Sequence, residues 1–216
     1  DYLPHNSLDL KTFPKRISPV DLAAGISASA AVNGIWKTKV TGRENIPEKD
    51  GFLICSNHRT VLDPEWVVHA FPKNRRKSIS IIGKSDLVFD NMFKRIIKLR
   101  NFIPVERFFN TVPTVDRCCE LLSEGKNVLI FPEGTNYENA ETMMPLKNGA
   151  AVIARRTGVP VLPVRISGVA YTNHMKNAFL PPIGGDITIT IGKPLDISRL
   201  SVQDANEAIK NAIDSL

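Results

Sequence analysis

The sequence predicts an α/β fold: a mainly parallel central sheet covered by helices, with an N-terminal helical lead-in. One observation behind this prediction is that short apolar runs of strand length alternate with longer segments of helical length. Such alternation is typical of crossover units, which build a parallel sheet with helices on both faces. The other is composition: 216 residues, 43% hydrophobic and 23% charged, suit one domain with a sizeable core. These values exclude a disordered chain and a disulfide-linked miniprotein.

The chain is predicted to divide into a lead-in at residues 1–37 and a main domain at residues 38–216. A proline at position 19 favours a helix over about 19–37. Its faces carry mostly small residues, which leaves both packing on the core and a membrane interface open. The uncharged stretch Leu22–Trp36 has 15 residues, fewer than the ~20 that a bilayer requires, so no transmembrane helix is predicted.

The main domain is predicted to contain six strands and five helices. The predicted strands are 52–55, 80–82, 102–105, 128–131, 161–164 and 187–191. The predicted helices are 64–70, 86–99, 112–124, 146–157 and 202–215. In open parallel sheets, ligands bind where loops leave the carboxyl ends of the strands, so functional residues are expected there.

The formal net charge of +6 is unevenly distributed. Residues 71–107 hold ten basic and three acidic side chains, a balance of +7 that leaves −1 for the rest of the chain. A positive segment of this kind favours an anionic partner, namely a phosphate-bearing small molecule, a nucleic acid or an anionic lipid surface. Nucleic acid is the least favoured, because the segment has no zinc finger, KH-type glycine loop or aromatic-rich strand.

The cysteines and histidines predict neither a disulfide framework nor a metal site. Two of the three cysteines, Cys118 and Cys119, are adjacent, which favours a reducing compartment. The four histidines are widely dispersed and form no His-x-x-x-His pair. A hydrolase or metal enzyme that uses His58, Asp63 and Glu133 stays an alternative.

The first motif with chemical potential is Ser56–Pro64, which begins where the strand 52–55 ends. If the chain turns between His58 and Asp63, the carboxylate can accept the imidazole N–H, and the pair can form a general base with its orienting group. No Ser or Cys nucleophile stands beside them, which favours direct transfer to an external alcohol. The alternative is that Asp63 caps a helix opened by Pro64 and that His58 is an ordinary loop residue.

The second motif is Phe131–Thr135, again a polar turn after an apolar strand. Gly134 would let a substrate approach the backbone closely, and Glu133 could accept hydrogen bonds from hydroxyls or from a basic residue. A tight turn with a solvated glutamate is the alternative.

Two basic residues follow other predicted strands. Arg107 comes after the strand 102–105 and offers a fork of donors suited to phosphate; a salt bridge with Glu106 or another neighbour is the alternative. Lys84 ends the strand near 80–82 and could add positive charge at the same edge of the sheet.

These motifs, taken in order, resemble those of the 1-acylglycerol-3-phosphate acyltransferase family of glycerolipid acyltransferases. The resemblance rests on His58 to Asp63, Phe102 to Arg107, Phe131 to Thr135 and Val159 to Val164, and extends over about residues 38–195. It implies an α/β sandwich around a mainly parallel sheet. The implied activity is transfer of a fatty acyl group from a coenzyme A or acyl carrier protein thioester to the hydroxyl of a lysophospholipid.

The resemblance also implies a role for each motif. His58 would be the base and Asp63 its partner. Arg107 would contact phosphate, and Glu133, Gly134 and Thr135 would belong to the acceptor site. The catalytic pair is intact, but Asn136 stands where many members have arginine, so one expected anion contact is missing.

The expected protein is therefore an O-acyltransferase of phospholipid biosynthesis that acts on 1-acylglycerol-3-phosphate to give phosphatidic acid. Acyl transfer to glycerol 3-phosphate or another lysolipid, and a noncatalytic binding module for anionic ligands or nucleic acid, are the alternatives. The acyl thioester is a co-substrate, and no cofactor or metal is expected. We expect peripheral association with an anionic membrane surface on the cytoplasmic side; because Asp1 is not Met, an upstream targeting segment could have been removed.

Overall fold

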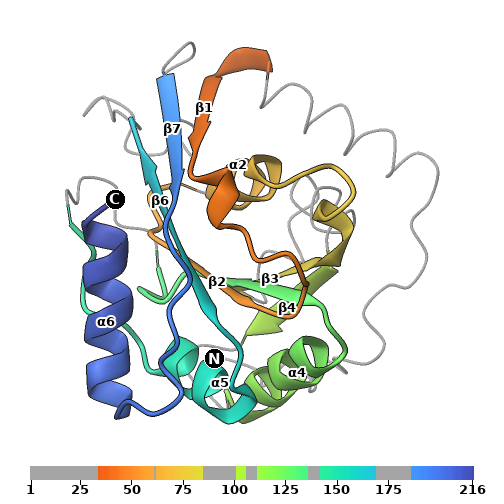
Figure 1. The fold of residues 1–216 in the computed structure, drawn as a ribbon, viewed down its shortest axis with the longest axis vertical. Coiled ribbons are helices and arrows are strands. Elements are labelled where there is room, and N and C mark those ends of the chain that lie inside the picture. Colours follow the sequence, from red (N-terminus) through yellow and green to blue (C-terminus); the bar gives the residue numbers. More distant parts are fainter. Residues whose placement is uncertain (1–33, 61, 85–100, 106–110, 136–141, 169–185) are drawn as a thin grey trace, which may run out of the picture.

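The central feature of the computed structural model is a seven-stranded sheet (Figure 1). The structure describes residues 34–60, 62–84, 101–105, 111–135, 142–168 and 186–216. The strands are β1 (Lys37–Thr41), β2 (Leu53–Ser56), β3 (Ile79–Lys84), β4 (Asn101–Val105), β5 (Asn127–Ile130), β6 (Val161–Ser167) and β7 (Asp186–Ile191). Their order is β1-β7-β6-β2-β5-β3-β4, and all neighbours are parallel except β6 and β7. The predicted mainly parallel sheet is confirmed.

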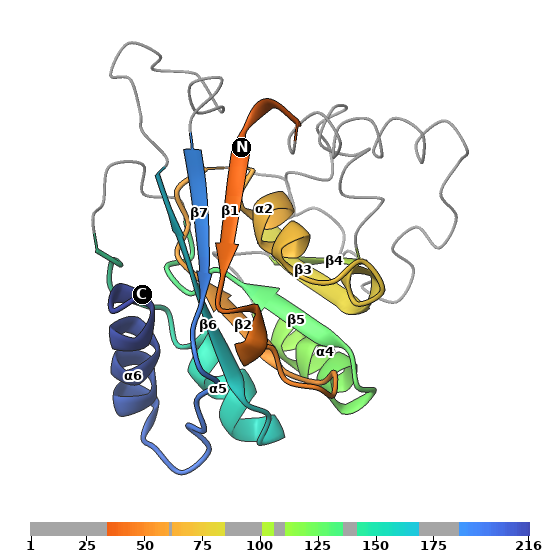
Figure 2. The ribbon, with the colours of Figure 1, turned by 45° about the horizontal axis from the view of Figure 1, so that its top comes forward.

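Helices cover both faces of this sheet (Figure 2). Helix α2 (Asp63–Ala70) lies on one face, over β6 and β7. The helices α4 (Val112–Ser123), α5 (Gly149–Thr157) and α6 (Val202–Asp214) lie on the other. Each face has its own hydrophobic cluster, one centred on Trp66 and Phe52 and the other on Leu53 and Ile153. Strand β2 is buried along its whole length because it lies in the middle of the sheet.

Most predicted elements are present with ends displaced by a few residues. All six predicted strands and four of the five main-domain helices occur. The helix expected at 86–99 lies outside the described residues, as does most of the one expected at 19–37. The end of the latter is wrong, because the helical turn at Gly34 and Ile35 gives way to strand β1 at Lys37. The division of the chain near residue 37 stays a prediction.

Strand β1 was not predicted because its sequence, KTKVT, is polar. It forms an edge of the sheet, where alternate residues are exposed and the others are half-buried. Lysines at such an edge discourage pairing with another chain. An edge strand of this composition carries little of the hydrophobic signal that identifies a buried strand.

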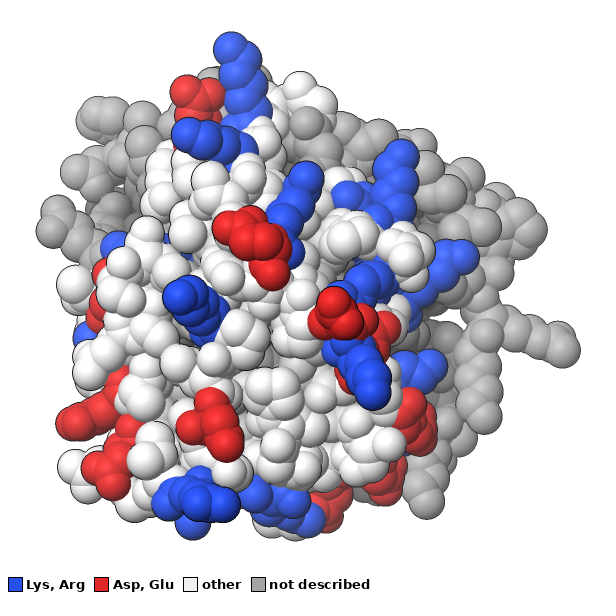
Figure 3. Space-filling model, in the orientation of Figure 1, with Lys and Arg blue, Asp and Glu red and all other residues white. Residues whose placement is uncertain are grey.

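The basic segment 71–107 does not form one continuous charged surface in the described residues. Arg75 pairs with Asp50, and Arg76 donates to the carbonyl oxygens of His69 and Phe71 at 2.8 and 2.9 Å. Residues 71–78 precede β3 and lie at the amino ends of the parallel strands, whereas Lys84 ends β3 and lies at their carboxyl ends. Figure 3 shows basic and acidic side chains interspersed over the described part of one face.

Candidate active site

The candidate site lies where β2 and β5 end, side by side and parallel. His58 follows the last residue of β2 by two positions, and Glu133 follows the last residue of β5 by three. The main-chain N–H of His58 donates to Glu133 Oε1 at 2.9 Å. The two predicted motifs, 75 residues apart in sequence, are therefore in direct contact.

His58 and Asp63 form the predicted pair. The imidazole Nδ1 lies 2.7 Å from Asp63 Oδ2, and the carboxylate is fully buried whereas the imidazole side chain is 16% exposed. With an Nδ1 proton held by the carboxylate, the neutral ring carries its lone pair on Nε2. That is the tautomer a general base needs.

Asp63 also organises the loop that carries His58. Its Oδ2 accepts the main-chain N–H groups of Arg59 and Thr60, and its Oδ1 accepts the Thr60 hydroxyl at 3.0 Å. The alternative in which Asp63 caps α2 is wrong, because the residue before the helix is Leu62 and no side chain caps this end. The carboxylate turns back to the loop, so loop conformation and ring orientation depend on the same group.

One face of the imidazole is covered by an aromatic ring. Phe131, the first residue after β5, stacks on His58 with ring centroids 4.2 Å apart and planes 23° apart. Together with the bond to Asp63, this contact restricts both rotation and tilt of the ring. The Phe131 role was not predicted, since only its place in the strand could be read from the sequence.

Glu133 is 1% exposed, so the alternative of a solvated glutamate is wrong. Its oxygens accept from the main-chain N–H groups of His58 and Met144 and from the guanidinium of Arg59. The predicted ability to accept hydrogen bonds from a basic residue is thus realised, with Arg59 as the partner. Contact between Glu133 and an acceptor molecule stays a prediction.

Gly134 and Thr135 complete the turn after Glu133. Gly134 has a φ of 77°, and its N–H donates to the Phe131 carbonyl at 3.0 Å. A Cβ at this position would lie 3.0 Å from Cγ of Lys147 and would strain the backbone, so the turn favours glycine. Thr135 is half-buried, and its predicted contact with the acceptor stays a prediction.

The two predicted phosphate contacts are only partly described. Lys84 ends β3 in register with Val105 of β4. Its backbone therefore lies at the carboxyl ends of the parallel strands, as His58 does. Arg107 lies outside the described residues. Both phosphate roles stay predictions.

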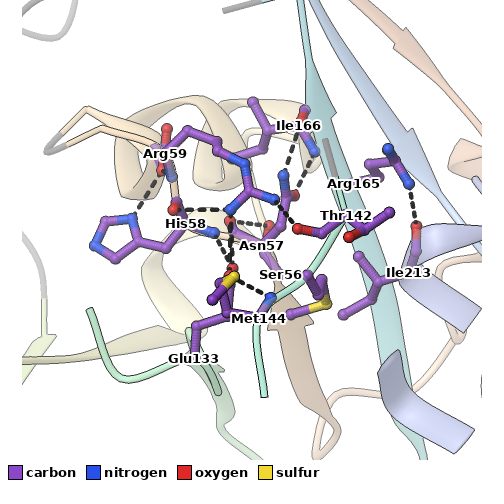
Figure 4. Close-up of polar contacts among 12 residues, drawn as sticks. Ser56, Asn57, His58, Arg59, Glu133, Thr142, Met144, Arg165, Ile166 and Ile213 are labelled. Carbon is purple, nitrogen blue, oxygen red and sulfur yellow. Dashed lines mark hydrogen bonds and ion pairs between the residues drawn. The ribbon is translucent and has the colours of Figure 1, made fainter. Parts of the chain in front are cut away.

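Two functional candidates within the first motif escaped sequence reasoning. The side chain of Asn57 makes two bonds to the main chain of Ile166, with Nδ2 donating at 2.9 Å and Oδ1 accepting at 2.7 Å. Arg59 is 6% exposed and bridges several groups around His58 (Figure 4). Their position beside His58 was the only available signal, because burial of a polar side chain cannot be read from one sequence.

Neither a metal centre nor a membrane span is found in the described part of the chain. Within it, no group of three or more His, Cys, Asp or Glu side chains is arranged to hold a metal ion. None of the helices placed by the structure is long and apolar enough to cross a bilayer.

With this geometry in view, comparison with known proteins identifies the family. A family model described as Acyltransferase matches residues 37–167, more than half of the chain. The chain belongs to this acyltransferase family. The resemblance predicted from its motifs, and with it the predicted class of protein, is confirmed.

Individual relatives of this chain are distant. A chloroplastic 1-acyl-sn-glycerol-3-phosphate acyltransferase of Brassica napus, BAT2, is 29% identical over 182 residues, covering 80% of this chain and 49% of its own. The 1-acyl-sn-glycerol-3-phosphate acyltransferase of Bacillus subtilis is 27% identical, and the match covers 82% of this chain and 84% of the bacterial protein. This chain thus spans about half the length of the plant relative and most of the bacterial one.

The fold of this chain is also found in a solved structure. The crystal structure of PlsC, a 1-acyl-sn-glycerophosphate (LPA) acyltransferase from Thermotoga maritima, matches with a TM-score of 0.67 and 24% identity. The match covers 91% of this chain and 78% of that one. It confirms the predicted sandwich around a mainly parallel sheet.

Proposed function

We propose that this protein transfers a fatty acyl group from an acyl-CoA or acyl-ACP thioester to the free hydroxyl of 1-acylglycerol-3-phosphate, producing phosphatidic acid. The observation that carries the proposal is the His58–Asp63 pair, 2.7 Å apart at the carboxyl end of β2. Support for this acceptor comes from relatives in plants and bacteria named for it.

The proposed reaction is direct acyl transfer. His58 Nε2 removes the proton from the acceptor hydroxyl as its oxygen attacks the thioester carbonyl. The resulting imidazolium is stabilised by the buried Asp63 carboxylate. When the tetrahedral intermediate collapses, the C–S bond breaks and the imidazolium returns its proton to the leaving sulfur. General base assistance of this kind contributes about 10²- to 10⁴-fold to the rate.

The proposed acceptor is amphiphilic, which favours a reaction at a lipid surface. We therefore propose peripheral association with an anionic membrane, on its cytoplasmic side. The chemistry needs no redox step, and the thioester itself supplies the activated acyl group.

The test measures thioester consumption by the purified protein. Donors are acyl-CoA and acyl-ACP; acceptors are 1-acylglycerol-3-phosphate, glycerol 3-phosphate and an uncharged lysolipid. We expect the highest turnover with 1-acylglycerol-3-phosphate, and a loss of about 10²-fold or more in the His58→Ala variant.

Two results would contradict the proposal. Near-normal turnover of a folded His58→Ala variant would remove His58 as the base. A strong preference for glycerol 3-phosphate or for the uncharged lysolipid would remove the proposed acceptor while leaving acyl transfer intact.

A further inference from the structure

Arg59 and Glu133 form a buried ion pair beside the catalytic loop. Arg59 Nη1 lies 3.1 Å from Glu133 Oε1 and 3.3 Å from Oε2, and the side chains are 7% and 0% exposed. Two charges removed from water are tolerated only where their remaining hydrogen-bonding capacity is also used. The question is therefore which groups use that capacity.

Much of it is used by the main chain of His58. Glu133 Oε1 accepts the His58 N–H at 2.9 Å, and Arg59 Nη1 donates to the His58 carbonyl at 3.1 Å. The pair thus holds both polar groups of that residue's backbone (Figure 4). The pair also binds the main chain of residues 142 and 144. Arg59 Nη2 donates to the Thr142 carbonyl at 3.2 Å, and Glu133 Oε2 accepts the Met144 N–H at 3.0 Å.

The pair acts on the backbone of His58 and not on its ring. Figure 4 shows the imidazole projecting away from the guanidinium and from Glu133. The ring has its own partners, Asp63 at Nδ1 and Phe131 on one face. Four contacts therefore fix His58: two on its peptide groups, one on the ring nitrogen and one on the ring face.

We infer that Arg59 and Glu133 are positioning residues that act as one unit, fixing the main chain from which the His58 imidazole projects. The inference rests on the proposed role of His58 as the base. It gives Glu133 a different role from the acceptor contact implied by the family resemblance, because its carboxylate is sealed and bonded within the protein. It assigns a function to Arg59, which lies between His58 and Asp63 in the motif.

The test is a double-mutant cycle with Arg59→Met, Glu133→Gln and the combined variant, measured on thioester turnover. Each single variant should lose about 10- to 100-fold in kcat, because small displacements of a catalytic group are costly, while KM for both substrates changes less than twofold. The combined variant should be no worse than the poorer single variant, since both remove the same device. Arg59→Lys should recover only part of kcat relative to Arg59→Met, because an ammonium keeps the positive charge beside Glu133 but cannot reproduce the fork that also reaches the Thr142 carbonyl.

The matched control is Arg156→Met, which removes an exposed ion pair with Asp116 remote from the site. Its kcat should equal that of the wild type. Circular dichroism establishes the temperature at which every variant is folded; should Glu133→Gln fail to fold, Arg59→Lys and Arg59→Met provide the kcat and KM comparison.

Three results would overturn the inference. One is a raised acceptor KM with unchanged kcat in Glu133→Gln, which would mean direct contact with the acceptor. Another is multiplication of the two single losses in the combined variant. The third is a wild-type kcat in folded Arg59→Met. His58→Ala is measured in parallel. If it stays active, His58 is not the base. If it is inactive while the losses of Arg59→Met and Glu133→Gln multiply in the combined variant, only the positioning role is contradicted.

Discussion

Asp63 serves two purposes at once, and this sets the consequence of replacing it. Its Oδ2 faces three donors: His58 Nδ1 and the main-chain N–H groups of Arg59 and Thr60. In Asp63→Asn the amide oxygen will occupy this position, because two backbone donors require an acceptor there. The amide nitrogen then faces the Thr60 hydroxyl, whose oxygen can accept from it.

The imidazole tautomer is therefore retained in Asp63→Asn, and only the negative charge is lost. We expect kcat to fall about 10- to 100-fold, the difference between a charged and a neutral hydrogen-bond partner. Asp63→Ala leaves four donors without their carboxylate partner, namely His58 Nδ1, the main-chain N–H groups of Arg59 and Thr60, and the Thr60 hydroxyl. It should therefore lose more, about 10³-fold. Steady-state kinetics on both variants decides the matter. An equal loss in the two would show that the amide does not replace the carboxylate in the loop.

The contact between His58 and Asp63 was predictable from one sequence, but its surroundings were not. The spacing of His58 and Asp63 at a strand end indicates chemistry that a loop can perform. The contacts of Arg59, Glu133 and Phe131 depend on the pairing of β2 with β5, which joins residues about 75 positions apart. Local pattern carries no information about which buried polar groups such pairing brings together.

The strands of this sheet are tied together at their amino ends by a polar cluster. Asp50, which precedes β2, accepts from Arg75 and from Asn127 Nδ2, the latter at 2.9 Å. Asn127 begins β5, and its Oδ1 accepts the Gly51 N–H at 2.9 Å while its Nδ2 also donates to Ser78, just before β3. Three strands thus begin from one network.

This network makes folding stability depend on pH. Burial opposes ionisation of Asp50, but hydrogen bonds from Asn127, Arg75 and Ser78 outweigh it, so the pKa of this carboxyl lies below its ordinary value of 3.8. A carboxyl with a lowered folded-state pKa stabilises the protein above its unfolded pKa, and this contribution is lost as pH falls through the folded value.

Asp50→Asn should therefore lower the free energy of unfolding at pH 7 by about 1 kcal/mol, which corresponds to about 2–4 °C in Tm for a domain of this size. The difference in free energy of unfolding between the wild type and Asp50→Asn should become smaller below about pH 4. Thermal unfolding followed by circular dichroism between pH 3 and 7 measures both effects. Asp116→Asn, in the exposed pair with Arg156, is the control and should change Tm little. A difference of constant size across this range would rule out the charge of Asp50 as its cause.

Elements were predictable in proportion to their hydrophobic signal. The apolar runs that became β2, β5 and β6 are buried and were identified, whereas polar β1 was missed. Strand order, and the antiparallel pairing of β6 with β7, could not be obtained from periodicity because they depend on contacts between distant segments.

At the scale of the whole molecule, lysines occur at both the amino and the carboxyl ends of the parallel strands. Lys73 is exposed and lies in the segment before β3, at the amino ends of the strands. The backbone of Lys84 lies at their carboxyl ends, where His58 also lies. If the site faces a lipid surface, these two lysines should contribute unequally to membrane binding.

Flotation with anionic vesicles tests this expectation. Wild-type protein should bind at low salt and be released at high salt, because screening weakens attraction between the basic side chains and the lipid. Lys84→Gln should weaken binding about fivefold, the equivalent of ~1 kcal/mol for one basic group near the surface. Lys73→Gln is the matched control and should bind as the wild type does. Equal weakening by both variants, or no binding at low salt, would contradict the proposed orientation.

The Asn57 bond to Ile166 spans 109 positions of the chain. The loop that carries His58 is thus anchored to a strand that is synthesised long after it. A ribosome-bound or partly refolded intermediate that lacks β6 cannot complete this anchor, however well β2 and β5 have paired. Recovery of turnover after dilution from denaturant should accordingly be among the last signals to appear, trailing the regain of helical and strand content.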